Sequence, residues 1–453
     1  MTKYLKSILL ILLSLLFSCN NETKDSKDFN PAIPIEITDF YPKEGAVNTR
    51  FYIYGKNFGT DINAIKVIIG GEEAKVIGSD GECIYCIIPA RAFDGSVKII
   101  IGESEAISSE KFTYIQKTVV STLCGNVTET GEYFVKDGSF EECGFGNDCN
   151  WISIDPVDNN ILYVVGENTS IRKVNLDEKN VSTVITNGQM NINRARSLSW
   201  LPDGSAMIIS NDQGSETGSS NVMLKRDDGF LRPQIITISN SCCGSDVHPQ
   251  YSEVYFSKWN DGTVHKYDFE SEEQKQLFKI WGQYYETNLH FHPSGDYAYL
   301  VIRNQNCIVK CKYNKDTREL ENGNVFCGAW NTSGYNDAIG QQARFNRLEQ
   351  GVFVKNSNYE KEGKPDIYDF YICDQQNHAI RKITPEGKVT TYAGRGSAGV
   401  NGDIWGYIDG DLRKEARFNQ PTGIAYSEEA KTFFIFDKNN FRIRKIEVDD
   451  NNN

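Results

Sequence analysis

The feature that most constrains this fold is a hairpin pattern that recurs along the chain. Its clearest copy spans residues 369–394, where Asp-Phe-Tyr-Ile-Cys-Asp is followed by a short turn, Ala-Ile-Arg-Lys-Ile and a further strand-like run. The Ile-Arg-Lys core returns at 171–174 and 443–446. More divergent copies lie at 206–225, 253–267 and 297–312. A repeat of this kind indicates supersecondary units that bury their apolar faces by stacking on one another.

The copy Asp374-Gln-Gln-Asn377-His378-Ala-Ile-Arg-Lys-Ile383 resembles the NHL repeat, in which two middle strands of a propeller blade flank such a turn. The resemblance implies a β-propeller over residues 117–453, and the copies named above imply six blades. Each copy follows a candidate innermost strand, at 151–155, 198–201, 246–248, 289–292, 351–355 and 423–427. The fold class that follows is all-β.

The closure of the ring is predicted by a segment that lies outside the repeat order. Residues 119–125 match 389–394, the outermost strand of a blade, although they precede the first full copy. The last copy stops after its third strand at Ile446. We therefore expect the early strand to complete the last blade, which would leave no long unpaired edge between the two ends of the ring.

Residues 34–116 show strand and turn patterns without helical periodicity. They contain Pro-Lys-Glu-Gly at 42–45, Tyr-Gly-Lys-Asn-Phe-Gly at 54–59, the pair Gly70-Gly71 and Ile-Ile-Pro at 87–89. In this order the motifs resemble those of an IPT/TIG domain. The resemblance implies an immunoglobulin-like β-sandwich that acts as a spacer or an interaction module.

The N-terminus predicts export. A cationic start precedes the apolar run 8–17, which is shorter than the ~20 residues that a membrane-spanning helix needs. Residues 1–18 are interpreted as a signal peptide, and Leu16-Phe17-Ser18-Cys19 resembles a lipobox, which makes Cys19 the predicted lipidation site. Residues 19–33 form a polar stretch typical of a flexible tether. The alternative is an ordinary signal peptide that contains a cysteine.

Charge and cysteine usage narrow the classes of partner and ligand. A net charge of -13 argues against a nucleic-acid partner, because such partners need clustered Lys and Arg. Of the 12 cysteines, Cys143 and Cys149 could close a loop by a disulfide, which an exported protein permits. Cys83 and Cys86 lack a second ligand pair and would face opposite sides of a strand, so no zinc site is expected.

The search for catalytic groups finds little. Of the five histidines, His248 and His292 stand before prolines at turns, while His265 and His378 belong to the repeats. His290 with Asp246 could begin a metal site, but a third ligand is not evident. Nucleophile-elbow, P-loop and dinucleotide motifs are absent from the sequence. We therefore expect no cofactor and no enzyme activity, with a propeller lyase or lactonase as the alternative.

Aromatic residues gather in the segments between blades and in one loop within a blade. We expect them on one propeller face, where rings offer flat apolar surfaces to sugars and nearby polar side chains offer hydrogen bonds. The predicted ligand-binding residues are Trp259, Trp281, Tyr284, Tyr285, Arg303, Asn306, Trp330, Tyr335, Trp405 and Tyr407. The alternative is that about half of these rings pack between blades.

Taken together, the lipobox, the IPT/TIG-like region and the NHL-like propeller resemble accessory lipoproteins of polysaccharide-utilisation systems of the Bacteroidetes. The resemblance implies an outer-membrane lipoprotein, anchored in the membrane by its lipid. It would bind an extracellular glycan beside a TonB-dependent transporter and its lid lipoprotein. Because a fold does not determine a function, a protein-interaction scaffold and a propeller enzyme stay open as alternatives.

Overall fold

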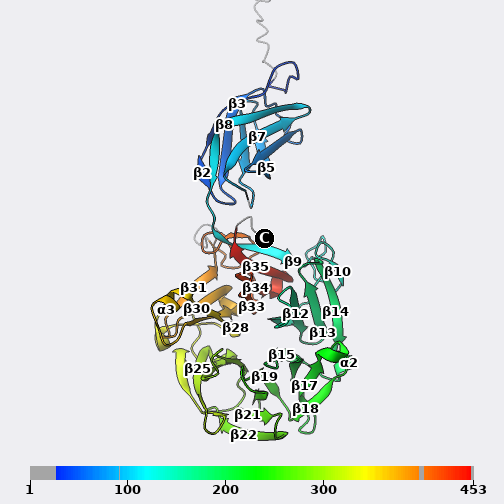
Figure 1. Ribbon diagram of the computed structural model, residues 1–453, viewed down its shortest axis with the longest axis vertical. Coiled ribbons are helices and arrows are strands. Elements are labelled where there is room, and N and C mark those ends of the chain that lie inside the picture. The colour runs from blue at the N-terminus through cyan, green and yellow to red at the C-terminus, as the bar shows by residue number, and fades with distance from the viewer. Residues whose placement is uncertain (1–26, 91, 397–401, 450–453) are drawn as a thin grey trace, which may run out of the picture. The chain divides into compact units, whose positions relative to one another are not determined.

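The computed structural model describes residues 27–90, 92–396 and 402–449, and Cys19 lies outside them. Two compact units are present, one reaching to Lys117 and including Asp449, the other formed by Thr118–Val448 (Figure 1). Strands dominate both units, which confirms the all-β prediction. Among the described residues, no helix combines the length and the apolar character needed to cross a membrane.

The first unit is the immunoglobulin-like sandwich. Hydrogen bonding links its strands in the order β1-β3-β6-β5-β4-β7-β8-β2. These are β1 (Glu36–Tyr41), β2 (Glu44–Gly45), β3 (Arg50–Lys56), β4 (Ile65–Ile69), β5 (Glu72–Ser79), β6 (Cys83–Ile87), β7 (Gly95–Ile101) and β8 (Ser104–Tyr114). Phe40, Phe51 and Phe112 pack ring against ring in its core. Gly55 is required because a Cβ there would lie 1.9 Å from the Glu36 carbonyl oxygen.

The second unit is a propeller of six blades arranged in a ring (Figure 1). Blade 1 contains β10 (Gly138–Ser139), β11 (Cys149–Ile154), β12 (Ile161–Gly166), β13 (Ser170–Asn175) and β14 (Asn180–Thr186). Blade 2 contains β15 (Ala195–Trp200), β16 (Ala206–Asn211), β17 (Ser219–Lys225) and β18 (Gln234–Ile238). Blade 3 contains β19 (Cys242–Val247), β20 (Glu253–Lys258), β21 (Thr263–Asp268) and β22 (Glu273–Lys279).

Blades 4 to 6 complete the ring. Blade 4 contains β23 (Thr287–Phe291), β24 (Tyr297–Ile302), β25 (Cys307–Asn314), β26 (Glu319–Leu320) and β27 (Asn324–Gly328). Blade 5 contains β28 (Leu348–Lys355), β29 (Tyr368–Asp374), β30 (Ala379–Ile383) and β31 (Val389–Gly394). Blade 6 contains β33 (Pro421–Ser427), β34 (Thr432–Asp437), β35 (Arg442–Val448), β9 (Thr118–Cys124) and β32 (Gly410–Asp411). The predicted number of blades is confirmed.

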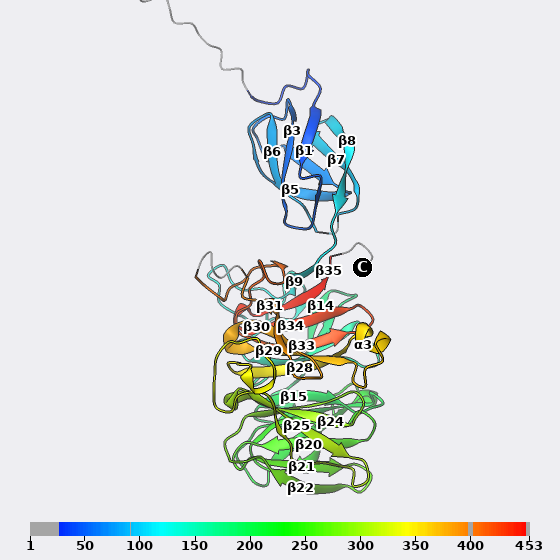
Figure 2. The same cartoon turned by 90° about the vertical axis from the view of Figure 1, so that its left-hand side faces the viewer.

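The ring is closed by β9, which lies next to β35 (Figure 2). The two strands are antiparallel, and their register pairs Thr118 with Val448, Val120 with Ile446 and Thr122 with Arg444. The last blade is therefore built from both ends of the propeller sequence, as the displaced outer-strand motif predicted.

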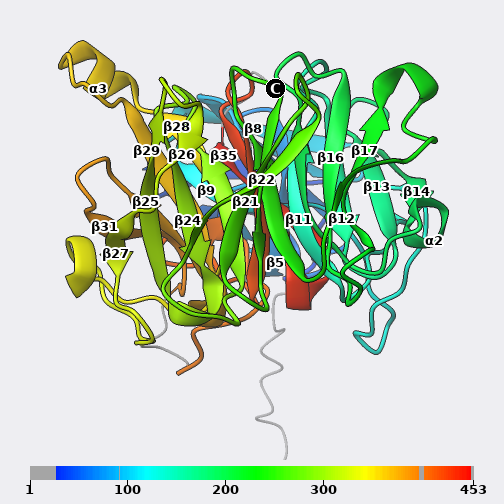
Figure 3. The ribbon, with the colours of Figure 1, turned by 90° about the horizontal axis from the view of Figure 1, so that it is seen from below.

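Short helices mark the two faces of the propeller. α2 (Asn187–Met190) connects the outermost strand β14 to the innermost strand β15, whereas α3 (Ser357–Lys361) connects the first and second strands of blade 5. The two helices therefore mark opposite ends of the strands, and Figure 3 shows α3 at one of the two faces. The α2 face carries the segments that enter each innermost strand, whereas the α3 face carries the loops between the first and second strands. Single 3₁₀ turns lie at Arg226–Asp228, Arg303–Gln305, Gly340–Gln342, Gln375–Asn377 and Lys438–Asn440.

The repeated Asp, Asn and Arg of the hairpin motif have a structural role inside the blade. Arg381 Nη1 and Asn377 Nδ2 donate to Asp374 Oδ2 at 2.6 and 2.8 Å. In blade 6, Arg444 Nη1 donates to Asp437 Oδ2 at 2.8 Å. Burial raises the pKa of Asp374 to about 6, even though Arg381 favours its charged form. The motif is thus a buried ion pair that holds the second strand to the third.

The cysteines are free thiols in the part of the chain that the structure describes. Cys143 and Cys149 therefore do not close a loop, although both are buried. The Cys143 thiol lies instead beside Cys124, where this neighbour and burial together raise the pKa of the Cys124 thiol. In β6, Cys86 is buried and Cys83 half-buried, in keeping with opposite sides of the strand.

Candidate binding site at the channel mouth

A pocket of about 400 Å³ opens where the central channel of the propeller meets the α2 face. Innermost strands begin at this face and second strands end there, so each blade presents two chain segments to the channel mouth. Blades 2, 3 and 4 line the pocket. The side chains that give it its chemical character are Arg194, Arg196, Asp212, Trp259, Glu286 and Arg303.

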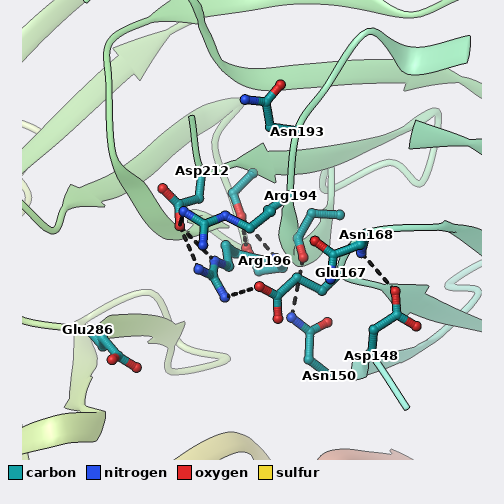
Figure 4. Close-up of polar contacts among 12 residues, drawn as sticks. Asp148, Asn150, Glu167, Asn168, Asn193, Arg194, Arg196, Asp212 and Glu286 are labelled. Carbon is teal, nitrogen blue, oxygen red and sulfur yellow. Dashed lines mark hydrogen bonds and ion pairs between the residues drawn. The ribbon is translucent and has the colours of Figure 1, made fainter. Parts of the chain in front are cut away.

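Arg196 is held on two sides by carboxylates, as Figure 4 shows. Its Nη1 donates to Glu167 Oε1 at 2.7 Å, and its Nε and Nη2 donate to Asp212 Oδ2 at 3.1 and 2.6 Å. Arg194 Nη2 lies 2.9 Å from the same Asp212 oxygen. Burial alone would lower the pKa of Arg196, but Glu167 and Asp212 raise it, so the guanidinium stays charged.

A second set of ion pairs continues the arrangement into blades 4 and 5. Arg303 Nη2 lies 2.6 Å from Glu349 Oε2 and Arg347 Nη2 lies 2.6 Å from Glu286 Oε2. Arg303 Nη1 lies 3.6 Å from Glu286. Burial acts to raise the pKa of Glu286, but Arg303 and Arg347 outweigh it and the pKa is lowered. The two arginines therefore favour the charged form of Glu286.

We call these side chains the channel-mouth network: Arg194, Arg196, Arg303, Arg347, Glu167, Asp212, Glu286 and Glu349. Four guanidinium groups meet four carboxylates, so the network carries no net charge. Guanidinium groups only donate hydrogen bonds and carboxylates only accept them. A hydroxyl group can do both, which makes a polyhydroxylated ligand a better match than a simple ion.

The thiol in this pocket is not an activated nucleophile. Cys243 lies in the lining, and its Sγ lies 3.6 Å from the Tyr285 carbonyl oxygen. Burial raises the pKa of Cys243 to about 12, so the thiol keeps its proton at neutral pH. Since the thiolate is the reactive form, the geometry supports binding at this position more than covalent chemistry.

A signal in the repeat register could have located the network from sequence. The residue directly after the second strand of each blade lies at the α2 face, and in chain order these residues are Glu167, Asp212, Trp259, Arg303, Gln375 and Lys438. Three of them, Asp212, Trp259 and Arg303, line the pocket. Trp259 was predicted from its ring and its loop between the second and third strands, and Arg303 as a nearby hydrogen-bonding residue. The charged residues Arg196, Asp212 and Glu286 were missed because sequence reasoning weighted aromatic rings over ion pairs.

The predicted aromatics form two groups beside the pocket. Trp259, 39% exposed, lines it and lies 4.8 Å from the Tyr284 ring, centroid to centroid. Trp330 meets Trp281 edge to face at 4.9 Å and Tyr285 at 5.1 Å. Trp281 is 52% exposed and Tyr285 and Trp330 are half-buried. The structure therefore brings these five predicted rings into a pair and a trio.

The other predicted residues lie apart from the pocket lining. Asn306 is buried, and its Oδ1 accepts the Arg347 N–H at 2.7 Å. Tyr335 lies under the Arg395 guanidinium at 3.7 Å, and Tyr407 lies under Arg442 at 4.2 Å. Trp405 is exposed, with no ring stacked on it among the described residues.

The channel below the pocket is obstructed. The rings of Trp151 in blade 1 and His290 in blade 4 stack at 5.4 Å and 4°. Because blades 1 and 4 face each other in a ring of six, this stack spans the channel. Gln350 Oε1 accepts the Ile152 N–H at 2.9 Å, and Gln350 Nε2 donates to the Ile152 carbonyl oxygen at 2.8 Å. The pocket is therefore closed at its inner end.

His290 and Asp246 do not begin a metal site. Burial lowers the pKa of His290 to about 3, and its Nε2 accepts the Gly351 N–H at 3.4 Å. Asp246 accepts the N–H groups of Val247 and Phe291 at 2.9 and 2.8 Å. Within residues 27–90, 92–396 and 402–449, no three His, Cys, Asp or Glu side chains are grouped so as to hold a metal ion.

The fold and the pocket define a class: an IPT/TIG domain joined to a six-bladed propeller with a polar pocket at its channel mouth. The IPT/TIG domain family model matches residues 34–115. Two solved structures named auxiliary nutrient binding proteins are similar, one from Bacteroides thetaiotaomicron and one from Bacteroides ovatus. The first is 42% identical over 94% of this chain and 100% of that chain, with a TM-score of 0.79. The second is 35% identical over 93% of this chain and 99% of that chain, with a TM-score of 0.72.

At this identity and coverage, the chain belongs to the same family as these Bacteroides proteins. Another Bacteroides thetaiotaomicron structure, described provisionally as a phosphatase, is 32% identical over 93% of this chain and 98% of its own, with a TM-score of 0.74. The chain also matches the chloroplastic protein SUPPRESSOR OF QUENCHING 1 of Arabidopsis thaliana at 24% identity over 71% of its length. It spans 27% of that protein.

Proposed function

We propose that this protein is an accessory component of a nutrient-uptake system and binds a neutral glycan in the channel-mouth pocket. The observation that carries the proposal is the charge-balanced network with Trp259 at its rim. Sugar hydroxyls would donate to Asp212 and Glu286 and accept from Arg196 and Arg303, while a sugar ring stacks on the indole. The nutrient-binding names of the Bacteroides relatives support the accessory role.

Titration calorimetry with a panel of soluble polysaccharides tests the binding proposal. Asp212→Asn removes a charged acceptor, and hydrogen bonds to charged groups contribute about 1.5–3 kcal/mol, so affinity should fall at least tenfold. Asp203→Asn is the matched control, because Asp203 lies in an exposed turn away from the pocket. Equal affinity of Asp212→Asn and wild type would contradict the proposal.

We further propose that Cys19 is lipidated and anchors the protein at the outer membrane, beside a TonB-dependent transporter and its lid lipoprotein. The lipobox-like Leu16-Phe17-Ser18-Cys19 supports the anchor, and the word auxiliary in the names of the relatives supports a partner system. Cys19→Ala should move the protein out of the membrane fraction or leave it unprocessed. An acylated, membrane-bound Cys19→Ala product would contradict the anchor.

A phosphoryl-transfer activity is the second candidate, favoured by the 32% identical relative described provisionally as a phosphatase. Arginine pairs also suit phosphate recognition. Hydrolysis of p-nitrophenyl phosphate that Arg196→Ala abolishes would replace the binding proposal. If no glycan binds and a transporter component co-purifies instead, the scaffold role becomes the better description.

A further inference from the structure

A second cavity lies between blades 5 and 6, on the α3 face. Its volume is about 310 Å³, within the range of small-molecule sites. It lies wholly within the unit Thr118–Val448 and shares no lining residue with the channel-mouth pocket. The side chains that define it are Asp369, Tyr371, Tyr392, Tyr426 and Phe433.

The four rings of this cavity repeat an arrangement between blades 4 and 5. There, Tyr299 contacts Phe326 and Phe370 at 5.2 and 5.1 Å, and Phe353 contacts Phe370 at 4.7 Å. The corresponding contacts between blades 5 and 6 are Tyr371–Tyr392 at 4.9 Å, Tyr371–Phe433 at 4.7 Å and Tyr426–Phe433 at 4.6 Å. The same cluster of four rings thus occurs twice, with one chemical difference among the rings themselves; around them, Tyr297 and the Lys310 ammonium group also contact the blade 4–5 rings.

That difference is two hydroxyl groups. Tyr392 and Tyr426 stand where the blade 4–5 cluster has Phe326 and Phe353. In the described parts of the chain, the hydroxyls of Tyr371, Tyr392 and Tyr426 have no hydrogen-bond partner. Burial raises the pKa of Tyr392 and of Tyr426 to about 12, so both phenols keep their protons and can donate as well as accept.

Asp369 adds an acceptor at the same place. It is 1% exposed, and its Oδ2 bonds Asn356 Nδ2 at 2.8 Å and Lys382 Nζ at 2.7 Å. Its buried Oδ1 accepts no hydrogen bond of good geometry in the described residues, although the Asp369 carboxylate lies near enough to the Tyr359 hydroxyl to raise the pKa of that phenol. The lining lysines are already paired, Lys355 with Glu360 at 2.7 Å and Lys431 with Glu428 at 2.5 Å. The cavity therefore offers hydrogen bonds without a free charge.

We propose that the inter-blade cavity formed by Tyr371, Tyr392, Tyr426, Phe433 and Asp369 is a second ligand site that takes one neutral sugar unit. Aromatic faces suit the C–H side of a sugar ring, and the phenols and the carboxylate suit its hydroxyls. A charged ligand is disfavoured because every ionised group in the lining has a partner. An apolar ligand would leave the phenols unpaired, which costs free energy.

Saturation-transfer NMR with D-glucose, D-galactose, D-mannose and D-xylose tests this site. The double variant Tyr392→Phe/Tyr426→Phe restores the blade 4–5 pattern without creating a void. Each neutral hydrogen bond contributes a factor of about two to twelve in affinity, so the loss of two should weaken binding by a factor of about four or more. Tyr299→Phe is the control for the loss of a phenol hydroxyl in the blade 4–5 cluster, where Tyr299 has the position of Tyr371.

Trp259→Ala separates this site from the channel-mouth pocket. The proposal expects at least one sugar to bind, the double variant to lose that binding, and Tyr299→Phe and Trp259→Ala to keep it. The proposal is overturned if no sugar of the panel binds, if the double variant binds like wild type with an unchanged melting temperature, or if Trp259→Ala abolishes the signal. The last outcome would locate the sugar in the channel-mouth pocket.

Discussion

Arginine–carboxylate pairs occur in two regions of the propeller and serve different purposes there. In blades 5 and 6, the side chains of Arg381 and Arg444 are 0% exposed and pair with Asp374 and Asp437, which are equally buried. At the channel mouth, the Arg196 side chain keeps 18% of its surface exposed and forms part of a pocket. The first region resembles the repeat consensus, and the second lies in blades that depart from it.

The difference indicates how a repeat fold can hold both a scaffold and a site. Where the hairpin motif is intact, its charges lie inside one blade, between the second and third strands. Where the motif is lost, as in blades 2 to 4, some charged residues stand at strand ends and pair between blades, although Glu253 and Lys266 still join the second and third strands of blade 3. Arg196 of blade 2, for example, bonds Glu167, which follows the second strand of blade 1.

Removing one partner of a buried pair should have the largest effect. Asp374→Ala removes one of the two carboxylates that pair with the fully buried Arg381 guanidinium, and only Asp337, at 2.7 Å, remains. The free energy of unfolding should therefore fall by up to about 3–5 kcal/mol. Asp212→Ala, at the partly exposed channel mouth, should cost clearly less. Urea unfolding followed by tryptophan fluorescence measures both, because all six tryptophans lie in the propeller. If Asp374→Ala and Asp212→Ala lost the same free energy of unfolding, the distinction between the two regions would be wrong.

Asp246, a half-buried carboxylate without an arginine partner, should respond to pH. Burial raises the pKa of Asp246 to about 7, from 3.8. The folded state therefore binds this proton more tightly, so its stabilisation is present below about pH 4 and is lost as the pH rises through 7. Between pH 4 and 8, wild type should lose about 1–4 kcal/mol of stability relative to Asp246→Asn. The expectation would be contradicted if the free energies of unfolding of wild type and Asp246→Asn changed with pH in the same way.

Variants of the pocket residues should lose glycan affinity and keep their stability, whereas variants of the buried ion pairs should lose stability and keep their affinity. Glu286→Gln removes the charge that Arg347 and Arg303 share, and glycan affinity should fall at least tenfold while stability changes by less than ~2 kcal/mol. Asp374→Asn should leave affinity unchanged at temperatures where the variant is folded. Calorimetric titration combined with thermal melts distinguishes these outcomes. An affinity loss in Asp374→Asn would mean that the two regions are coupled.

The rings outside the pocket lining should have the smallest effects. Trp281 belongs to the trio beside the pocket, so Trp281→Ala should weaken glycan binding by a factor of about two to twelve. Trp405 lies apart, and Trp405→Ala should change affinity less than twofold. A larger loss with Trp405→Ala than with Trp281→Ala would show that the glycan extends along the blade 5–6 loops.

The architecture was predictable because its signals are local. The hairpin that contains Asp374 and Arg381 is contained in one blade, so a short stretch of sequence shows its strands, its turn and its ion pair. The outer-strand match of residues 119–125 also predicted the pairing of β9 with β35. The IPT/TIG-like turns were equally predictable from sequence, because a position such as Gly55, where another backbone segment approaches closely, has no room for a side chain.

The site was only partly predictable because its contacts join different blades. Trp259 and Arg303 were expected in a binding site and do line the pocket. The pairing of Arg196 with Glu167 and Asp212 depends on aligning blades 1 to 3, where the repeat is weakest. Residue type also does not show whether a ring is free: Tyr335 and Tyr407 lie against arginines, whereas Trp281 is half exposed.

The pairing of β9 with β35 also governs how the propeller forms during synthesis. Thr118 can pair with Val448 only after Val448 has been synthesised, so blade 6 cannot be completed until nearly the whole propeller has been made. Contacts between residues so distant in sequence form slowly, because the entropy of the intervening loop must be lost first. Until then β9 is a strand with an open edge, exposed to wrong pairing. Ring closure is therefore the step at which a nascent chain most needs protection.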